Sequence, residues 1–123
     1  MHELSIAMNL VELAAESARQ AGAERVVAVH LRLGTMAGVV REALEFCFPL
    51  AAEGTLLAGA QLVIEPVPLI IACTTCGRDV QPDLGSFCCP FCGTPSATIR
   101  QGRELQLVSL EIPDPEPALE ERQ

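Results

Sequence analysis

The sequence predicts an α+β fold in which two helices pack on a small β-sheet and a cysteine-rich module is inserted between two of the strands. Three observations support this fold class. Apolar residues recur at helical spacing in two segments, strand-like segments occupy much of the remaining chain, and two Cys-x-x-Cys turns interrupt the strands. We therefore expect one compact body with one small appendage.

The composition indicates an aliphatic core and excludes several classes of protein. Half of the 123 residues are hydrophobic, but there is no Trp or Tyr and there are only four Phe. The formal net charge of −8 opposes attraction to a phosphate backbone, so we expect no nucleic-acid partner. Because the start lacks a basic signal region and no apolar stretch approaches the about 20 residues that span a bilayer, we expect a soluble, cytoplasmic protein that does not enter membranes.

The first helix is predicted from residue 4 to residue 19. Its apolar side chains recur at helical spacing, as at Leu4, Met8, Val11, Ala15 and Ala18. Glu3 near its start suits the helix dipole, and Gly22 provides a stop. A helix that begins this early leaves Met1 and His2 free beside its first turn.

The remaining elements follow in order. Residues 25–33 alternate apolar and polar side chains, which predicts a half-buried strand closed by Gly34. Helical spacing returns over 40–48, and Pro49 is expected to kink or end that second helix because it lacks a backbone donor. Three further segments complete the expected sheet, at 61–65, 69–73 and 105–112.

These elements predict a division into three parts. The helices and the sheet form one domain from residues 1–72, with a last strand supplied by residues 98–113. Residues 73–97 are rich in Cys, Pro and Gly and form an inserted ribbon. Residues 114–123 are acidic and rich in Pro, so we expect an extended, flexible tail.

The ribbon carries two Cys-x-x-Cys turns separated by twelve residues. Their cysteines are Cys73 and Cys76 in the first turn, and Cys89 and Cys92 in the second. Two intervening residues let both sulfurs of a turn point to one side, and Gly77 and Gly93 permit the tight backbone that follows. Four thiolates gathered in this way predict a closed, tetrahedral, structural zinc site, with redox dithiols as the alternative.

Two other cysteines need separate interpretations. Cys88 directly precedes Cys89 and offers a neighbouring thiol, so it is either a spare or an alternate ligand. Cys47 lies on the apolar face of the second predicted helix, where we expect it to be a small buried hydrophobic residue.

The N-terminus suggests a second metal site. A histidine at position two is incidental in most chains, but the Met1 amine and the His2 ring can both offer lone pairs near neutral pH. A square-planar nitrogen set from the Met1 amine, the His2 amide and ring, and the Glu3 backbone amide would suit nickel(II) or copper(II) better than zinc. His30 lies on the polar face of a predicted strand, and we expect a solvated side chain there.

Together these motifs resemble the HypA/HybF family of hydrogenase nickel incorporation proteins. The residues that carry the resemblance are Met1-His2-Glu3-Leu4-Ser5, Leu33-Gly34, Leu44-x-Phe46-x-Phe48, the two cysteine turns and Gly102-Arg103-Glu104-Leu105. The resemblance extends from Met1 to about Ile112. The Met-His-Glu start combined with the two turns is far more specific than the zinc pattern alone.

The resemblance implies a nickel metallochaperone with a small mixed sheet and an inserted zinc ribbon. Nickel, as cargo, would bind His2 with the Met1 amine and the Glu3 backbone, and structural zinc would bind the four cysteines of the ribbon. The implied partners are a GTP-hydrolysing maturation protein, the large subunit of nickel-iron hydrogenase and, for some members, urease maturation proteins. Some members have a carboxylate near the start of the second helix where this chain has Val40, so we assign no fifth nickel ligand.

Two other functions are an enzyme and an adaptor for protein–protein interaction. The sequence shows no nucleophile, base or open metal position, so we do not expect an enzyme. A zinc-stapled adaptor for protein–protein interaction without nickel transfer is the alternative, and a weak homodimer is compatible with either function. The two differ at His2, because replacement by Ala would abolish nickel binding only in a nickel carrier.

Overall fold

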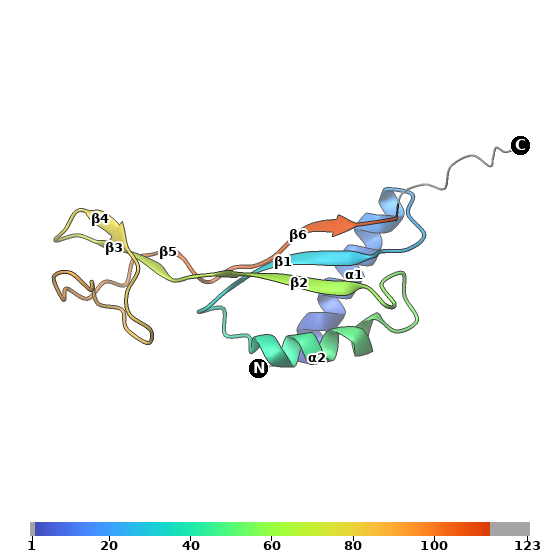
Figure 1. Ribbon diagram of the computed structural model, residues 1–123, viewed down its shortest axis with the longest axis horizontal. Coiled ribbons are helices and arrows are strands. Elements are labelled where there is room, and N and C mark those ends of the chain that lie inside the picture. The colour runs from blue at the N-terminus through green and yellow to red at the C-terminus, as the bar shows by residue number, and fades with distance from the viewer. Residues whose placement is uncertain (1, 114–123) are drawn as a thin grey trace, which may run out of the picture.

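The computed structural model describes residues 2–113 and consists of two lobes (Figure 1). The elements in chain order are α1 (Glu3–Gln20), β1 (Ala28–Gly34), α2 (Arg41–Ala52), β2 (Gln61–Val67), β3 (Ile70–Cys73), β4 (Arg78–Val80), β5 (Ile99–Gln101) and β6 (Leu105–Glu111). We call residues 2–67 and 105–113 the helix lobe and residues 68–104 the cysteine lobe. Met1 and the acidic tail at 114–123 lie outside the described residues.

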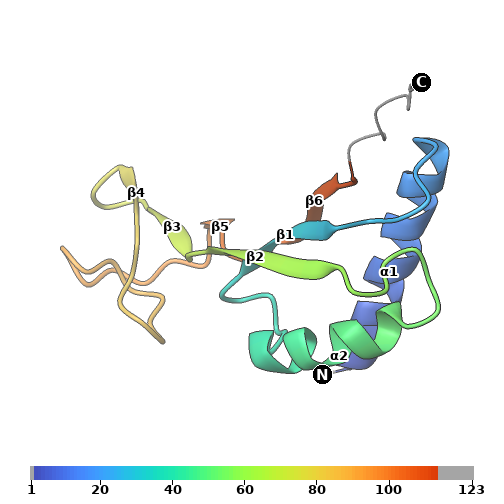
Figure 2. The same ribbon diagram turned by 45° about the vertical axis from the view of Figure 1, so that its right-hand side comes forward.

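The sheet of the helix lobe is mixed, as predicted. Its strand order is β2-β1-β6, and β1 pairs parallel with β2 and antiparallel with β6. Parallel neighbours require a crossover connection, which α2 provides between β1 and β2. Both views of the fold show α1 and α2 on the same face of this sheet (Figures 1 and 2).

Alternation along β1 decides which face of the sheet the helices cover. Val29, Leu31 and Leu33 are buried, whereas His30 and Arg32 on the opposite face are partly exposed. The buried side chains of β1 join two clusters with the helices. One contains Val11, Ala14, Ala15, Ala18, Val26, Val29, Phe48, Ala52 and Leu57, and the other contains Ala7, Leu10, Leu31, Leu33, Leu44 and Ile64. The predicted aliphatic core is therefore present, with Phe48 as its one buried aromatic side chain among the described residues.

The helices differ slightly from the sequence-based expectation. α1 ends at Gln20 and is followed by Gly22 at φ 78°, the left-handed conformation that glycine favours. α2 does not end at Pro49 but continues to Ala52. Pro49 and Glu45 are both exposed, so the carbonyl that loses its helical partner can bind water. Within residues 2–113, neither helix is long and apolar enough to cross a membrane.

The cysteine lobe has its own three-stranded sheet, with the order β4-β3-β5. The segment predicted at 69–73 therefore belongs to a second sheet rather than to the first one. Pro66 and Pro68 cannot donate backbone hydrogen bonds, so pairing with β1 ends at Val67 and the chain leaves the first sheet. A small core of Ile71, Cys73, Val80 and Cys89 lies behind the second sheet.

The two lobes meet where glycines allow backbones to approach closely. A Cβ atom on Gly34 would lie 2.1 Å from the carbonyl oxygen of Gly102, and one on Gly102 would lie 2.8 Å from Cα of Leu69. The Gly34 N–H donates to the Glu104 carbonyl at 2.7 Å, and the Met36 N–H donates to the Gly102 carbonyl at 2.7 Å. The loop after β1 is thus fastened to the strand that returns from the cysteine lobe.

Candidate metal centres

The four-cysteine cluster is built by two turns of the same local design. Cys73 ends β3, and the N–H of Gly77 donates to the Cys73 carbonyl at 2.8 Å. In the second turn the N–H of Gly93 donates to the Cys89 carbonyl, also at 2.8 Å. Gly77 and Gly93 have φ values of 68° and 78°, the conformation expected from the sequence.

The geometry of the four sulfurs fits a tetrahedral zinc ion. All four ligand atoms lie within 4.8 Å of one another. The distance from Cys73 Sγ to Cys92 Sγ is 3.5 Å, and that from Cys76 Sγ to Cys89 Sγ is 3.8 Å. Four sulfurs at about 2.3 Å from one zinc ion define edges of about 3.8 Å, whereas a disulfide would require about 2.05 Å. The thiols are free, and the cluster matches the size of a closed zinc shell.

The environment of the thiols also suits a cation. Cys73 and Cys89 are buried in the small core, and Cys76 and Cys92 lie at the surface. A hydrogen bond with the Thr94 hydroxyl lowers the pKa of Cys92 to about 6, whereas hydrogen bonding to Cys92 raises the pKa of Cys76 to about 12. Adjacent thiols hold protons between them when no cation is bound, and a divalent ion displaces those protons.

Cys88 and Cys47 are not among the converging thiols. Cys88 is exposed, its N–H donates to Ser86 Oγ at 3.0 Å, and it forms an isolated bridge with Pro95. That pairing orients the backbone before the second turn and leaves the ligand position to Cys89. Cys47 is half-buried rather than buried as predicted, but it packs as a small hydrophobic residue against the cluster that contains Leu44.

The N-terminal site lies at the start of α1. His2 is exposed and directly precedes the helix, and its carbonyl accepts the Ile6 N–H at 3.0 Å. The first amides of a helix have no carbonyl partner within it, so the Glu3 nitrogen is not used by the helix. The Met1 amine of the predicted nickel set falls outside the described residues.

The side chain of Glu3 has a role that the sequence analysis did not identify. Glu3 is buried, and its carboxylate accepts the N–H of Val40 at 3.0 Å. This hydrogen bond lowers the pKa of Glu3, and the N–H of Glu3 itself contributes in the same direction. The bond joins the first turn of α1 to the residue that precedes α2. A contact between residues 3 and 40 leaves no local signal in the sequence.

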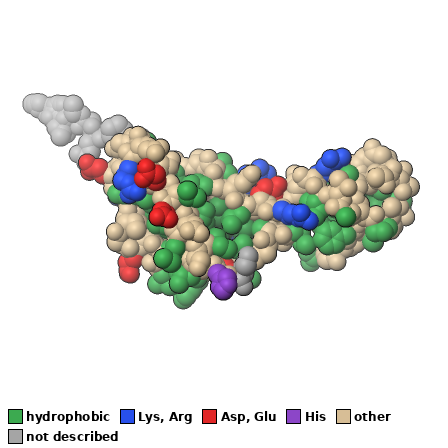
Figure 3. Space-filling model, turned by 180° about the vertical axis from the view of Figure 1, so that it is seen from behind, with side chains coloured by type: hydrophobic (Ala, Val, Ile, Leu, Met, Phe, Trp, Pro, Cys, Tyr) green, Lys and Arg blue, Asp and Glu red, His purple; other side chains and the backbone are tan. Residues whose placement is uncertain are grey.

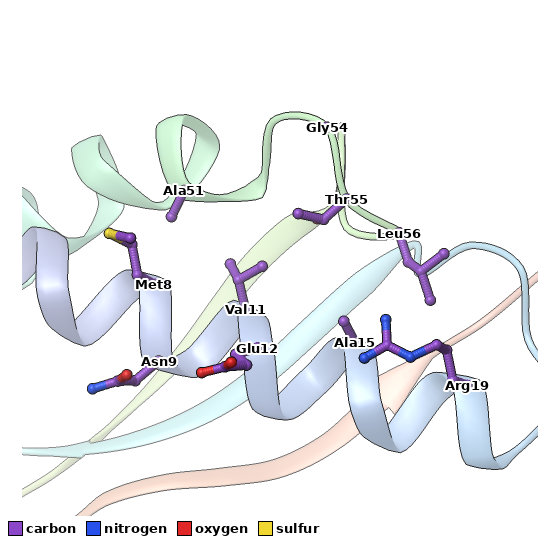
Figure 4. Close-up of a pocket in the computed structure, with 10 residues that line it drawn as sticks. All are labelled: Met8, Asn9, Val11, Glu12, Ala15, Arg19, Ala51, Gly54, Thr55 and Leu56. Atoms are coloured by element: carbon purple, nitrogen blue, oxygen red, sulfur yellow. The ribbon is translucent and has the colours of Figure 1, made fainter.

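Neither His30 nor the largest hollow we describe contributes to a metal site. His30 pairs with Glu111 across β1 and β6, on the sheet face away from the helices. A hollow of about 740 Å³ lies between α1 and the segment that follows α2. Figure 4 shows its ten lining residues, which include neither histidine nor cysteine. The candidate metal centres are therefore the N-terminus in the helix lobe and the four-cysteine cluster in the cysteine lobe.

Comparisons with known proteins agree on one family. Residues 1–112 match the family described as "Hydrogenase/urease nickel incorporation, metallochaperone, hypA". The chain is 54% identical over 114 residues to the hydrogenase maturation factor HypA of Chloroflexus aggregans, covering 92% of this chain and 100% of that protein. It is 42% identical over 119 residues to the HypA of Streptomyces avermitilis, covering 93% and 88%. The fold is similar to the solution structure of the Ni metallochaperone HypA from Helicobacter pylori, with a TM-score of 0.64, 26% identity and coverage of 91% and 97%.

Proposed function

Since this chain belongs to the HypA family of hydrogenase and urease nickel incorporation metallochaperones, we propose that it carries nickel at its N-terminus and delivers it during maturation of a nickel-iron hydrogenase. Nickel is cargo in this proposal, not a resident cofactor. The observation that carries the proposal is the position of His2, exposed and directly before α1. The His2 imidazole and the neighbouring backbone amides, which have no carbonyl partner within the helix, together offer several nitrogen ligands from consecutive residues. Nickel(II) accepts such a set in a square plane.

The proposed nickel ligands are the Met1 amine, the amide and ring of His2, and the backbone amide of Glu3. The buried Glu3 carboxylate supports this arrangement because its bond to the Val40 N–H holds the first turn of α1 against the start of α2. The nitrogen ligands would therefore extend from a fixed helix end, while His2 itself stays exposed for release of the ion.

We also propose that Cys73, Cys76, Cys89 and Cys92 hold one structural zinc ion. The sulfur separations of 3.5 and 3.8 Å support a single tetrahedral ion, and a shell of four thiolates has no open position for a substrate. Zinc would stabilise the cysteine lobe, because two of its ligands, Cys73 and Cys89, belong to the small core of that lobe. The proposed domain division has residues 73–97 as the zinc ribbon and residues 1–72 and 98–113 as the nickel domain, with the paired strands β3 and β5 at the boundary between the two.

The proposed setting is the cytoplasm. The hydrogenase large subunit would receive the ion and a maturation GTPase would assist, with urease maturation proteins as further candidates. The relatives at 42–54% identity are hydrogenase maturation factors, which supports a role among such proteins. We propose no catalytic activity for the chain itself.

The test compares untagged wild type with His2→Ala and with His30→Ala as a matched control. His30 is the other histidine of the chain and lies on the sheet face away from the helices. Bound zinc, bound nickel and circular dichroism are measured for each protein. We expect wild type and His30→Ala to bind both metals, and His2→Ala to keep zinc and fold but lose nickel. Equal nickel uptake by all three proteins would leave the chain as a zinc-stapled adaptor.

A further inference from the structure

The cysteine lobe carries an exposed arginine that has no ionic partner among residues 2–113. Carboxylates pair with Arg19, Arg32, Arg41 and Arg100, whereas Arg103 forms no ion pair with any residue from 2 to 113. Arg78 also lies in this lobe, but its guanidinium is 4.4 Å from the ring centre of Phe91. Arg103 is therefore the cation of this lobe that remains available to a ligand.

Two hollows have Arg103 among their lining residues. One has a volume of about 420 Å³ and is lined by Phe87, Pro95, Ser96, Ala97, Ile99 and Arg103. The other, of about 300 Å³, is lined by Ile99, Arg100, Gln101, Arg103 and Glu104. Ile99 and Arg103 line both, so the hollows adjoin along β5. The first is mostly apolar, whereas the second has polar and apolar surface in about equal parts, so the two hollows offer different side-chain positions beside one cation.

The strand that contributes to both hollows, β5, lies at an edge of its sheet. β5 pairs with β3 on one side, and no strand among the described residues pairs with its other side. Edge strands present backbone N–H and carbonyl groups that an extended peptide can pair with, and alternate side chains of such a peptide enter pockets on the sheet surface. The arrangement of β5, an apolar hollow and Arg103 therefore suits a short extended segment.

The distribution of charge favours an acidic segment at this position. Residues 69–104 contain three Arg and three acidic residues and have no net charge, whereas the described part of the helix lobe contains four Arg and nine acidic residues. On the face shown in Figure 3, the cysteine lobe presents basic side chains beside hydrophobic ones, and the acidic side chains lie on the helix lobe and toward the junction. An acidic peptide would be repelled by the helix lobe and accepted by the cysteine lobe.

We propose that the edge of β5 is a docking site for an extended segment of a partner protein that combines an aliphatic or aromatic side chain with a nearby carboxylate. The apolar side chain fills the hollow beside Phe87 and Ile99, and the carboxylate binds the Arg103 guanidinium. This site needs no nickel and lies in the lobe opposite to His2, so it would hold a client or partner while the ion is transferred elsewhere.

The experiment selects binders from a library of random heptapeptides displayed on phage, using the full-length, zinc-loaded, nickel-free protein. The most enriched peptide is then titrated into ¹⁵N-labelled protein and followed by amide chemical shifts. Arg103→Gln and Phe87→Ser test the site, and Arg25→Gln is the matched control because Arg25 is an exposed arginine of the helix lobe. Zinc content and the amide spectrum of each variant report that the cysteine lobe remains folded.

We expect enriched peptides to carry Asp or Glu close to an apolar residue, and the shifts to centre on residues 99–103. Binding should weaken at least about tenfold in Arg103→Gln, which loses a charge-assisted hydrogen bond, and in Phe87→Ser, which loses apolar contact with the peptide. Binding should stay unchanged in Arg25→Gln. Peptides without acidic residues, shifts outside the cysteine lobe, or equal binding by Arg103→Gln would overturn the proposal. So would displacement of the peptide by an equally charged oligothymidylate, which would indicate recognition of phosphate. Since nickel is absent throughout, failure here would leave the proposed nickel site unaffected.

Discussion

Two phenylalanines in α2, two residues apart, should differ strongly in how much stability the same substitution costs. Phe48 is 1% exposed and lies in a core cluster with Val11, Val29 and Leu57, whereas Phe46 is 73% exposed. Removing a buried phenyl ring leaves a cavity that the surrounding side chains fill only in part, which costs about 3–5 kcal/mol of unfolding free energy. Removing an exposed ring changes that free energy by no more than about 0.5 kcal/mol.

The measurement is urea unfolding at constant, saturating zinc, followed by the helical circular dichroism signal. Zinc must be held constant because any ligand that binds only the folded chain adds to the apparent stability. A loss of about 3–5 kcal/mol is a large share of the stability of a typical domain, so Phe48→Ala should shift the midpoint strongly or leave the helix lobe unfolded in buffer. Phe46→Ala should unfold at nearly the wild-type urea concentration.

The two variants control for each other, since both replace Phe by Ala in the same helix and gain the same small amount of helix propensity. The reasoning would be refuted by equal destabilisation of both variants, because burial of the ring would then not decide the effect, and the gain in helix propensity from Phe to Ala is favourable in both. A larger loss in Phe46→Ala would show that the exposed face of α2 is covered in the protein in solution.

Two other predictions concern the candidate metal centres. Removing zinc with a chelator at neutral pH should collapse the amide chemical-shift dispersion of residues 70–101. The helical circular dichroism signal should persist, because both helices lie in the other lobe. Loss of both signals together would contradict independent folding of the two lobes. Glu3→Gln should remove part of the acid sensitivity of the fold, measured as unfolding free energy at several pH values. The folded pKa of Glu3 lies below its ordinary value of 4.5, so its ionised form stabilises the protein above that value and the contribution disappears as the pH falls through the folded pKa. The difference between wild type and variant should therefore be larger at pH 7 than at pH 3, and a constant difference would argue against the bond to Val40.

The sequence was informative wherever the signal is local or periodic. Apolar spacing located α1 within a residue at each end, and alternation along residues 25–33 identified which side chains of β1 face the core. The two Cys-x-x-Cys turns identified the four thiols that converge, because their spacing and the following glycines fix the same turn twice. The absence of Trp and Tyr and the small number of Phe predicted the aliphatic core without reference to the fold.

The features that the sequence did not determine all depend on contacts between distant residues. Whether the strand at residues 70–73 joins the first or the second sheet depends on pairing across the chain, and its β-branched residues fit either sheet equally well. Likewise, the carboxylate of Glu3 reaches the amide of Val40 only because α1 and α2 pack side by side.

Sequence by itself therefore determined which residues offer side chains or backbone atoms suited to a metal ion, and where the two helices and the four longer strands lie. Tertiary structure alone decided how those segments are shared between two sheets, and that His2 and the four cysteines lie in different lobes. It also decided that Arg103, which has no ion pair within the described range 2–113, lines an apolar hollow. The physical reason is that propensity, periodicity and ligand spacing act within a few residues, whereas sheet membership and uncompensated charge arise only when distant segments come together.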